Sequence, residues 1–354
     1  MAGGQNLKSK IGCASIAGEN RNDISRSRYF IKVQDGCRQF CTYCIIPYVR
    51  GDLRSRQAEE VIAEVKQALA RGYREIVLCG IHLGLYGVDH VAHNMEHVTT
   101  GSCHPELDSG SRGIEVKRGR TDNSWIPGQA RDDKMGERLG EDRINLVTLL
   151  KQLIKIDGLG KIRLSSIEPN EVTDELIDLI KTSGKICRHL HIPLQSGNDK
   201  ILKLMNRPYT TKRFSSKIKK IRQAVPGIAL TTDVIVGFPG ESVGDFDKTV
   251  AFIKKMKFSK VHVFPFSAHE RTPASKMPGQ VAENVKFERS KKLSALSGKL
   301  EKAYRQKFKG KKLAVIIDGR SKDGHYRGKT EYYFDVEFES KIHYCQGDSV
   351  IVKV

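Results

Sequence analysis

Three cysteines lie close together after the first apolar run of the chain: Cys37, Cys41 and Cys44, in a C-x3-C-x2-C arrangement. Three thiolates on one loop can hold three corners of a cubane 4Fe–4S cluster. The loop has no fourth cysteine at a matching spacing, so one iron would lack a protein ligand and could coordinate a small molecule. The alternatives are a zinc site completed by a distant ligand, or buried thiols, although structural zinc sites more often use paired C-x2-C units.

The chain around this loop alternates between short apolar runs rich in Val and Ile and longer stretches of helical period. This alternation predicts an α/β fold, a partial or complete (β/α) barrel in which the chemistry lies on the loops after the strands. The predicted strands are Tyr29–Val33, Glu75–Cys79, Lys161–Ser165, His189–Pro193, Ala229–Val236 and Lys260–Phe264. The predicted helices are Ala58–Arg71, Leu146–Ile156, Thr173–Thr182, Lys212–Ala224 and Val243–Met256.

Two stretches break this alternation. Residues 1–28 are polar and indicate a tail or linker into a barrel predicted over 29–280. Residues 90–142 contain seven glycines, charges of both signs and no usable period. A structureless loop of this length is rare inside a compact domain, so we expect a disordered insertion. The alternative is metal binding by its His90, His93, His97, Cys103 and His104, but no helix or strand would fix these side chains.

The chain is strongly basic. Among its 354 residues, 61 Lys and Arg oppose 41 Asp and Glu, which gives a net charge of +20. This excess favours a polyanionic partner such as nucleic acid. It is densest in a helix predicted over 281–312, where the basic residues form either a solvated face or a phosphate-binding one. The candidates for phosphate contact are Lys291, Lys292, Lys299, Lys302 and Arg305.

Residues 313–354 change to a period of two, with strands predicted at Leu313–Ile317, Tyr333–Phe338 and Ser349–Val352. The pattern predicts a small C-terminal antiparallel sheet or β-barrel. Small β-barrels are common nucleic-acid-binding modules, although fold analogy alone is weak support for a function.

No apolar run approaches the ~20 residues that a bilayer span needs, and Met1–Lys10 lacks the apolar block of a secretory signal. We therefore expect a cytoplasmic, monomeric protein without membrane contact. In a reducing compartment its eight cysteines are not a disulfide framework. Cys79, Cys187 and Cys345 lie in or beside apolar runs and are expected to be buried thiols.

Four stretches resemble the methylthiotransferases of the radical S-adenosylmethionine (SAM) superfamily: 35–48, which contains the cysteine trio, 162–169, 189–197 and 232–241. Gly184–Cys187 and Leu202–Tyr209 most resemble the branch that modifies N6-threonylcarbamoyladenosine next to the tRNA anticodon. The tail is similar to the TRAM domain, a small RNA-binding β-barrel. The resemblance implies an enzyme that replaces an aromatic C–H of a hypermodified tRNA adenosine with a methylthio group, using an external electron donor.

The resemblance also implies residue roles. Cys37, Cys41 and Cys44 would hold one 4Fe–4S cluster, and the amino and carboxylate groups of SAM would chelate its open iron. One-electron reduction would then give methionine and a 5′-deoxyadenosyl radical. Tyr43 would lie near the adenine, Gly80 near the SAM amino group, and Glu168 near the ribose. The residues expected to bind SAM are Tyr43, Gly80, Ser166, Glu168, Gln195, Ser196, Val236 and Gly237.

Methylthiotransferases of this family normally begin with a further domain whose three cysteines hold a second cluster. Residues 1–28 contain only Cys13 and resemble the linker into the barrel. We therefore expect full activity to need a separately encoded N-terminal domain. The alternatives are a catalytically incompetent tRNA-binding fragment, or a methylthiotransferase acting on another tRNA adenosine or on a ribosomal protein.

Overall fold

The structure, a computed structural model, describes residues 27–90 and 144–354. The linker expected over 1–28 and the insertion expected over 90–142 therefore lie almost wholly outside the described residues.

Six parallel strands form the barrel. They are β1 (Tyr29–Asp35), β3 (Glu75–Gly80), β4 (Lys161–Leu164), β5 (His189–His191), β6 (Ala229–Val236) and β7 (Lys260–Pro265). β1, β3 and β4 share one sheet with the short antiparallel β2 (Arg54–Ser55), and β5, β6 and β7 form a second sheet. Bridges between Ile162 and Ile186 and between Ser166 and His191 join β4 to β5. The predicted α/β fold with a partial barrel is confirmed, with β2 and β7 as its edges within the described residues.

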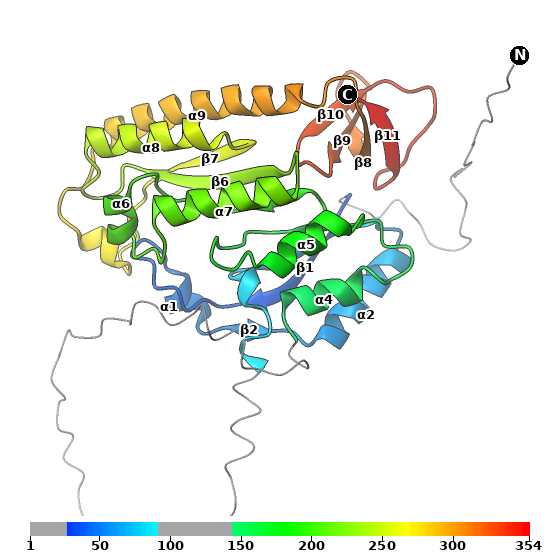
Figure 1. Cartoon of the computed structure of the whole chain (residues 1–354), viewed down its shortest axis with the longest axis horizontal. Helices are drawn as coiled ribbons and strands as arrows, with labels where there is room; N and C mark the ends of the chain where they lie inside the picture. The colour runs from blue at the N-terminus through cyan, green and yellow to red at the C-terminus, as the bar shows by residue number, and fades with distance from the viewer. Residues whose placement is uncertain (1–26, 91–143) are drawn as a thin grey trace, which may run out of the picture.

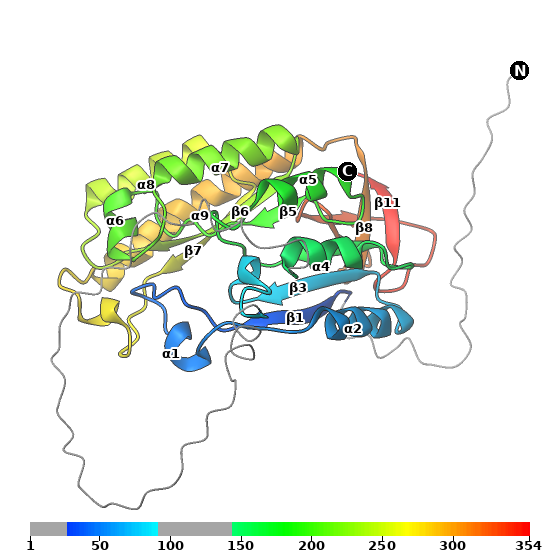
Figure 2. The same cartoon turned by 60° about the horizontal axis from the view of Figure 1, so that its bottom comes forward.

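Amphipathic helices connect these strands and pack on their outer faces (Figures 1 and 2). The side chains of Thr173 and Ser242 accept hydrogen bonds from the first turns of α5 and α8, which explains why both helices begin there. The connecting helices are α2 (Ala58–Ala70), α4 (Leu146–Leu153), α5 (Asp174–Thr182), α7 (Thr211–Ala224) and α8 (Val243–Met256). The short elements α1 (Ile46–Arg50), α6 (Asp199–Leu204), η2 (Leu83–Leu85) and η3 (Pro273–Lys276) were not predicted.

The basic helix is α9 (Glu283–Gln306), shorter than the predicted 281–312. The chain leaves the helix in a turn that contains Gly310, whose φ of 78° is left-handed, before the next strand begins at Lys312. It packs on β7, where the Ser297 hydroxyl donates to the carbonyl of Val261 over 2.8 Å. Lys286 and Arg289 are buried against the barrel, so these two basic residues do not belong to a solvated face. Among the described residues, no helix is long and apolar enough to cross a membrane.

The tail forms a four-stranded antiparallel sheet in the order β10–β9–β8–β11. Its strands are β8 (Lys312–Arg320), β9 (Tyr326–Thr330), β10 (Asp335–Phe338) and β11 (Ser349–Lys353). β9 was not predicted, because its sequence YRGKT shows no apolar alternation. Within residues 312–354 no pairing between β10 and β11 closes the sheet, so the expected small barrel is an open sheet.

This C-terminal sheet covers the amino ends of the barrel strands, away from α1 and α6 (Figure 1). Glu75, the first residue of β3, accepts a hydrogen bond from Arg163 over 2.7 Å and pairs with Arg28 over 3.1 Å. Arg163 also donates to the carbonyl of Thr330 over 3.1 Å. The His189 ring stacks on Tyr333, with centroids 4.1 Å apart. The amino end of the barrel is therefore closed by a buried, charged contact.

Replacing Glu75 tests this contact. The side chain is 1% exposed, so Glu75→Ala leaves the Arg163 guanidinium buried without its carboxylate. Breaking a buried ion pair in this way is expected to lower the free energy of unfolding by about 3 kcal/mol in urea titrations. In the control, Glu175→Ala removes an exposed pair with Lys151 and should cost less than about 1 kcal/mol. Equal losses in both variants would contradict the assignment.

Candidate functional site

The three predicted cluster cysteines lie on one loop, residues 36–45, between β1 and α1, which we call the cysteine loop. The loop begins with a tight turn at Gly36, whose φ of 74° is in the left-handed region. A β-carbon there would overlap the carbonyl of Asp52, so only glycine allows the turn. The amide of Cys37 then donates to the carbonyl of Gly51 over 3.1 Å. The local sequence thus places the first cysteine at the carboxyl end of β1.

Hydrogen bonds fix the middle of the cysteine loop to two distant segments. Thr42 donates through its amide to the carbonyl of Met205 over 3.1 Å, and through its hydroxyl to that of Leu204 over 2.8 Å. The carbonyl of Thr42 accepts from the amide of Ala274 over 2.8 Å. The loop is therefore held between the end of α6 and η3.

Cys41 is buried, whereas Cys37 and Cys44 are half-buried. Burial raises the pKa of the Cys41 and Cys44 thiols, and Arg207 partly offsets this effect at Cys41. Among the described residues, no three His, Cys, Asp or Glu side chains converge as ligands of a single metal ion. A cubane cluster needs no such convergence, because each thiolate binds a different iron. Three thiols on one fixed loop fit this donor set.

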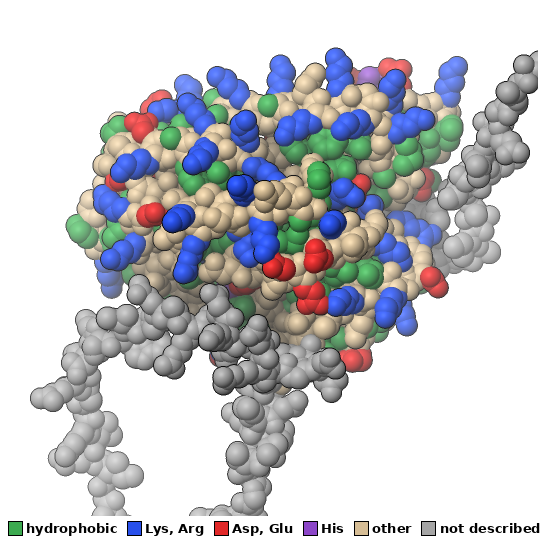
Figure 3. Space-filling model, in the orientation of Figure 1, with side chains coloured by type: hydrophobic (Ala, Val, Ile, Leu, Met, Phe, Trp, Pro, Cys, Tyr) green, Lys and Arg blue, Asp and Glu red, His purple; other side chains and the backbone are tan. Residues whose placement is uncertain are grey.

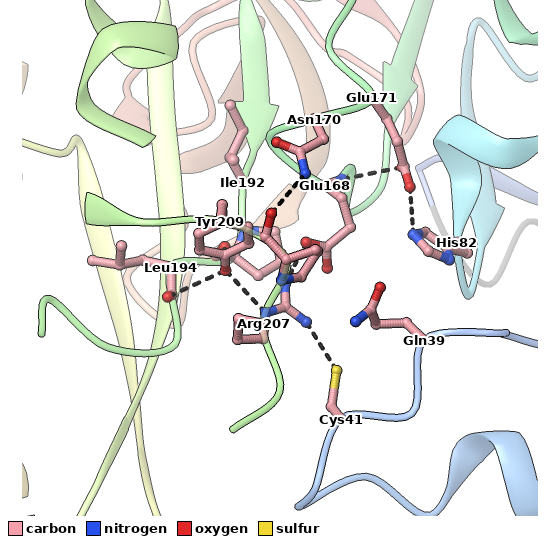
Figure 4. Close-up of polar contacts among 12 residues, drawn as sticks. Gln39, Cys41, His82, Glu168, Asn170, Glu171, Ile192, Leu194, Arg207 and Tyr209 are labelled. Carbon is pink, nitrogen blue, oxygen red and sulfur yellow. Dashed lines mark hydrogen bonds and ion pairs between the residues drawn. The ribbon is translucent and has the colours of Figure 1, made fainter. Parts of the chain in front are cut away.

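Arg207, in the loop after α6, lies at the centre of the site (Figure 4). Its side chain is 3% exposed and forms an ion pair with Glu168. The same guanidinium donates to Cys41 Sγ over 3.1 Å and to the Tyr209 hydroxyl over 3.1 Å. The Tyr43 hydroxyl lies 3.5 Å away. One buried cation therefore ties the cysteine loop to the loop that follows β4.

A second network connects Cys37 to the end of β3. The imidazole of His82 pairs with Glu171 through Nε2 (Figure 4). Its Nδ1 lies 3.6 Å from Cys37 Sγ. Burial alone would lower the pKa of His82, but the hydrogen bonds to Cys37 and Glu171 and the charge of Glu171 raise it to about 10. His82 therefore carries a positive charge at neutral pH and donates to both neighbours.

Two of the expected SAM-binding residues line a cavity of about 240 Å³ at the carboxyl end of the barrel. Tyr43 contributes from the cysteine loop and Gln195 from the loop after β5. The φ of Gln195 is 62°, a left-handed conformation that is rare outside glycine and concentrates at functional sites. The other lining residues are Asp233, Ile235, Phe264, Pro265, Phe266 and Ser267.

The other expected SAM-binding residues are not among those that line this cavity. Glu168 is engaged by Arg207, and the fully buried Ser196 bonds to Thr249 of α8 over 3.3 Å. Val236 is fully buried, and Gly237 has a φ of 72° with Lys286 packed against it. Gly80 donates to Ser165 Oγ over 3.3 Å, and Ser166 is half-buried beside β5.

The candidates for phosphate contact are all exposed on α9, far along the chain from the cysteine loop. Lys292 pairs with Asp247 over 3.0 Å, and Arg305 donates to the carbonyl of Asp335 over 3.0 Å. Figure 3 shows lysine and arginine side chains spread over the face formed by α7, α8 and α9. The exposed candidates are Lys291, Lys292, Lys299, Lys302 and Arg305.

Sequence reasoning did not assign a role to Arg207, His82, Glu171 or Asp233. Arg207 lies within Leu202–Tyr209, a stretch singled out only for its resemblance. Its left-handed neighbour Asn206, with a φ of 56°, is the local feature that turns the chain here. Of the expected buried thiols, Cys187 is buried, whereas Cys79 and Cys345 are half-buried.

The sequence profile of the Radical SAM superfamily matches residues 31–253. Threonylcarbamoyladenosine tRNA methylthiotransferase MtaB of Bacillus subtilis is 39% identical over 89% of this chain and 59% of the relative. tRNA-2-methylthio-N(6)-dimethylallyladenosine synthase of Clostridium novyi is 33% identical over 86% of this chain and 56% of the relative. Coproporphyrinogen III oxidase of Escherichia coli, a radical SAM enzyme, aligns with a TM-score of 0.49 and 11% identity, covering 86% of this chain and 67% of that one.

The chain thus spans less than two thirds of the length of these two curated relatives. The profile covers more than half of the chain and includes the cysteine loop, the loop after β4 and β6. The chain belongs to the radical SAM superfamily.

Proposed function

We propose that this chain is the radical-SAM portion of a tRNA methylthiotransferase that acts on N6-threonylcarbamoyladenosine next to the anticodon. One observation carries the proposal: a fixed loop with three thiols lies beside a cavity at the carboxyl end of the barrel. The similarity to methylthiotransferases that modify tRNA supports the substrate class. The 39% identity to a relative named for threonylcarbamoyladenosine supports the choice of nucleoside.

The chemistry that a 4Fe–4S cluster supplies when bound here is the one-electron cleavage of SAM, with the electron drawn from an external donor. Cys37, Cys41 and Cys44 would hold this cluster. Arg207 and His82 would orient two of the thiolates through their N–H groups. Such hydrogen bonds fix the position of the ligating sulfur and partly offset its negative charge. The burial of Arg207 and of Cys41 keeps water away from this side of the site.

The cavity walls suit an adenosyl group. Ile235, Phe264 and Phe266 offer apolar surface, whereas Gln195 and Asp233 offer hydrogen-bonding groups. The ion pair to Arg207 uses Oε2 of Glu168, so we propose Oε1 as the acceptor for a ribose hydroxyl. Ser196 would act indirectly, because its bond to Thr249 holds the chain next to Gln195 in place.

Cluster assembly and SAM cleavage test the cysteine trio. After anaerobic reconstitution with iron and sulfide, we expect the wild-type chain to take up a cluster, seen by absorbance and iron content, and to release 5′-deoxyadenosine from SAM when reduced. Cys41→Ala should lose both, because one corner of the cluster lacks its thiolate. The control Cys187→Ala removes a buried thiol outside the cysteine loop and should retain both. An unaltered cluster in Cys41→Ala would refute the site.

Arg207 variants test the centre of the site in the cluster-free protein. Arg207→Met leaves the Glu168 carboxylate without its cation, so the free energy of unfolding of the cluster-free protein should fall by about 3 kcal/mol. Arg207→Lys should lie between wild type and Arg207→Met, because lysine keeps the charge but not the planar donor geometry. The exposed control Arg213→Met on α7 should change stability by less than about 0.5 kcal/mol. Equal stabilities of Arg207→Met and Arg213→Met would argue against the central role.

Binding and product analysis test the substrate. We expect tRNA affinity to fall with salt, and Lys299→Ala with Lys302→Ala to reduce the slope of log K against log salt by about 1 per lysine removed. Lys66→Ala, an exposed lysine on α2, is the control and should leave the slope unaltered. With the N-terminal domain of such a methylthiotransferase supplied separately, mass spectrometry of tRNA nucleosides should find the methylthio group on threonylcarbamoyladenosine. Product on another adenosine would replace the proposed nucleoside, and binding without SAM cleavage would indicate an incompetent RNA-binding fragment.

A further inference from the structure

Two aromatic rings project into solvent at the cysteine loop, one from the loop itself and one from the helix that follows it. Phe40 lies between the first and second cysteines of the trio, and its side chain is 53% exposed. Tyr48 lies in α1, and its side chain is 51% exposed. Their rings form an edge-to-face pair with centroids 5.8 Å apart. The carbonyl of Phe40 accepts a hydrogen bond from Asn206 Nδ2 over 2.8 Å, so the backbone is fixed while the ring points outward. The pair is therefore a preformed apolar surface on a rigid support.

Three more exposed apolar side chains lie at the same carboxyl end of the barrel. Val49 follows Tyr48, Ile81 follows β3, and Phe264 lies at the end of β7, where it also lines the cavity. We call Phe40, Tyr48, Val49, Ile81 and Phe264 the apolar rim. They are half of the ten large apolar side chains that are exposed in the described residues. Half of the exposed large apolar side chains therefore lie at the end of the barrel that contains the cavity, where the contacting pair Phe40 and Tyr48 offers an apolar surface to a ligand.

Positive charge is interleaved with the rim. Residues 29–56 contain five basic and two acidic side chains. Arg38 pairs with Asp52, and Arg50 lies 3.9 Å from Asp35. Arg54 is exposed, and its guanidinium donates to the carbonyl of Arg50 over 3.0 Å. Aromatic faces together with arginines are the combination that binds single-stranded nucleic acid, because bases stack on the rings and phosphates contact the cations.

We propose that Phe40 and Tyr48 are a stacking platform for unpaired RNA bases next to the nucleotide that enters the cavity, with Arg54 contacting the adjoining phosphate. The inference rests on the proposed function. It assigns to Phe40 and Tyr48 the recognition of a single-stranded RNA loop. A base in a hairpin loop must leave the stack to reach the cavity, and its neighbours then need a new stacking partner. The exposed pair on the outer side of the cysteine loop supplies one.

The test compares two RNA probes by fluorescence anisotropy with the full chain: a synthetic hairpin with an unpaired loop, and a fully paired duplex of the same length. Phe40→Ala and Tyr48→Ala should each weaken hairpin binding at least about fivefold and leave duplex binding and the salt slope unaltered. Tyr48→Phe should retain the wild-type affinity, because the stacking face is kept. Arg54→Ala should reduce the salt slope by about 1.

The matched control is Phe287→Ala, which removes another exposed phenyl ring, 64% exposed on α9, that lies beside Val243 and Phe246 of α8. It should bind both probes like the wild type. Thermal unfolding of every variant shows whether the fold is intact, and Tyr48, outside the trio, separates stacking from damage to the cysteine loop. Wild-type hairpin affinity in both Phe40→Ala and Tyr48→Ala overturns the platform and leaves the rim as a surface for another protein. Failure of SAM cleavage with a preserved hairpin preference would instead overturn only the proposed reaction.

Discussion

The guanidinium of Arg207 contacts three groups that only tertiary folding brings to it: the Cys41 thiol, the Tyr43 hydroxyl and the Glu168 carboxylate. It also contacts the hydroxyl of nearby Tyr209. Removing such a group from water is costly, and the cost is offset only when its donors are paired. Glu168 supplies the counter-charge, and Cys41 and Tyr209 satisfy further N–H groups. The cysteine loop, the loop after β4 and the loop after α6 can therefore be in place only together.

The two ends of the barrel differ in which side chains are buried and which are exposed. At the amino end, Glu75 and Arg163 are buried beneath the C-terminal sheet, and His189 stacks on Tyr333. At the carboxyl end, aromatic side chains remain in solvent around a cavity. Buried ion pairs hold both ends, and only the open end combines them with exposed aromatic rings and with the half-buried Gln195 in its left-handed conformation.

Short stretches of sequence predicted the helices, strands and loops whose bounds are set by neighbouring residues. The bounds of β6 and α8 were predicted correctly, because β6 is rich in β-branched residues and Ser242 with Asp245 forms a capping box. The spacing of the cysteine trio predicted the cysteine loop in the same way. The contact of Arg207 with Cys41 joins residues 166 positions apart, which no window of sequence reveals. The inward side of α9 was missed because Arg289 looks like a surface residue until buried Glu241 is placed beside it.

α9 reaches both ends of the molecule. Near its start Lys286 packs against Gly237, and near its end Tyr304 joins the core of the C-terminal sheet. The 24 residues of the helix make it about 36 Å long, at ~1.5 Å per residue. The helix thereby sets a fixed distance between the C-terminal sheet and the carboxyl end of the barrel. A ligand that contacts both must be long enough to bridge this distance, so ligands are selected by length as well as by chemistry.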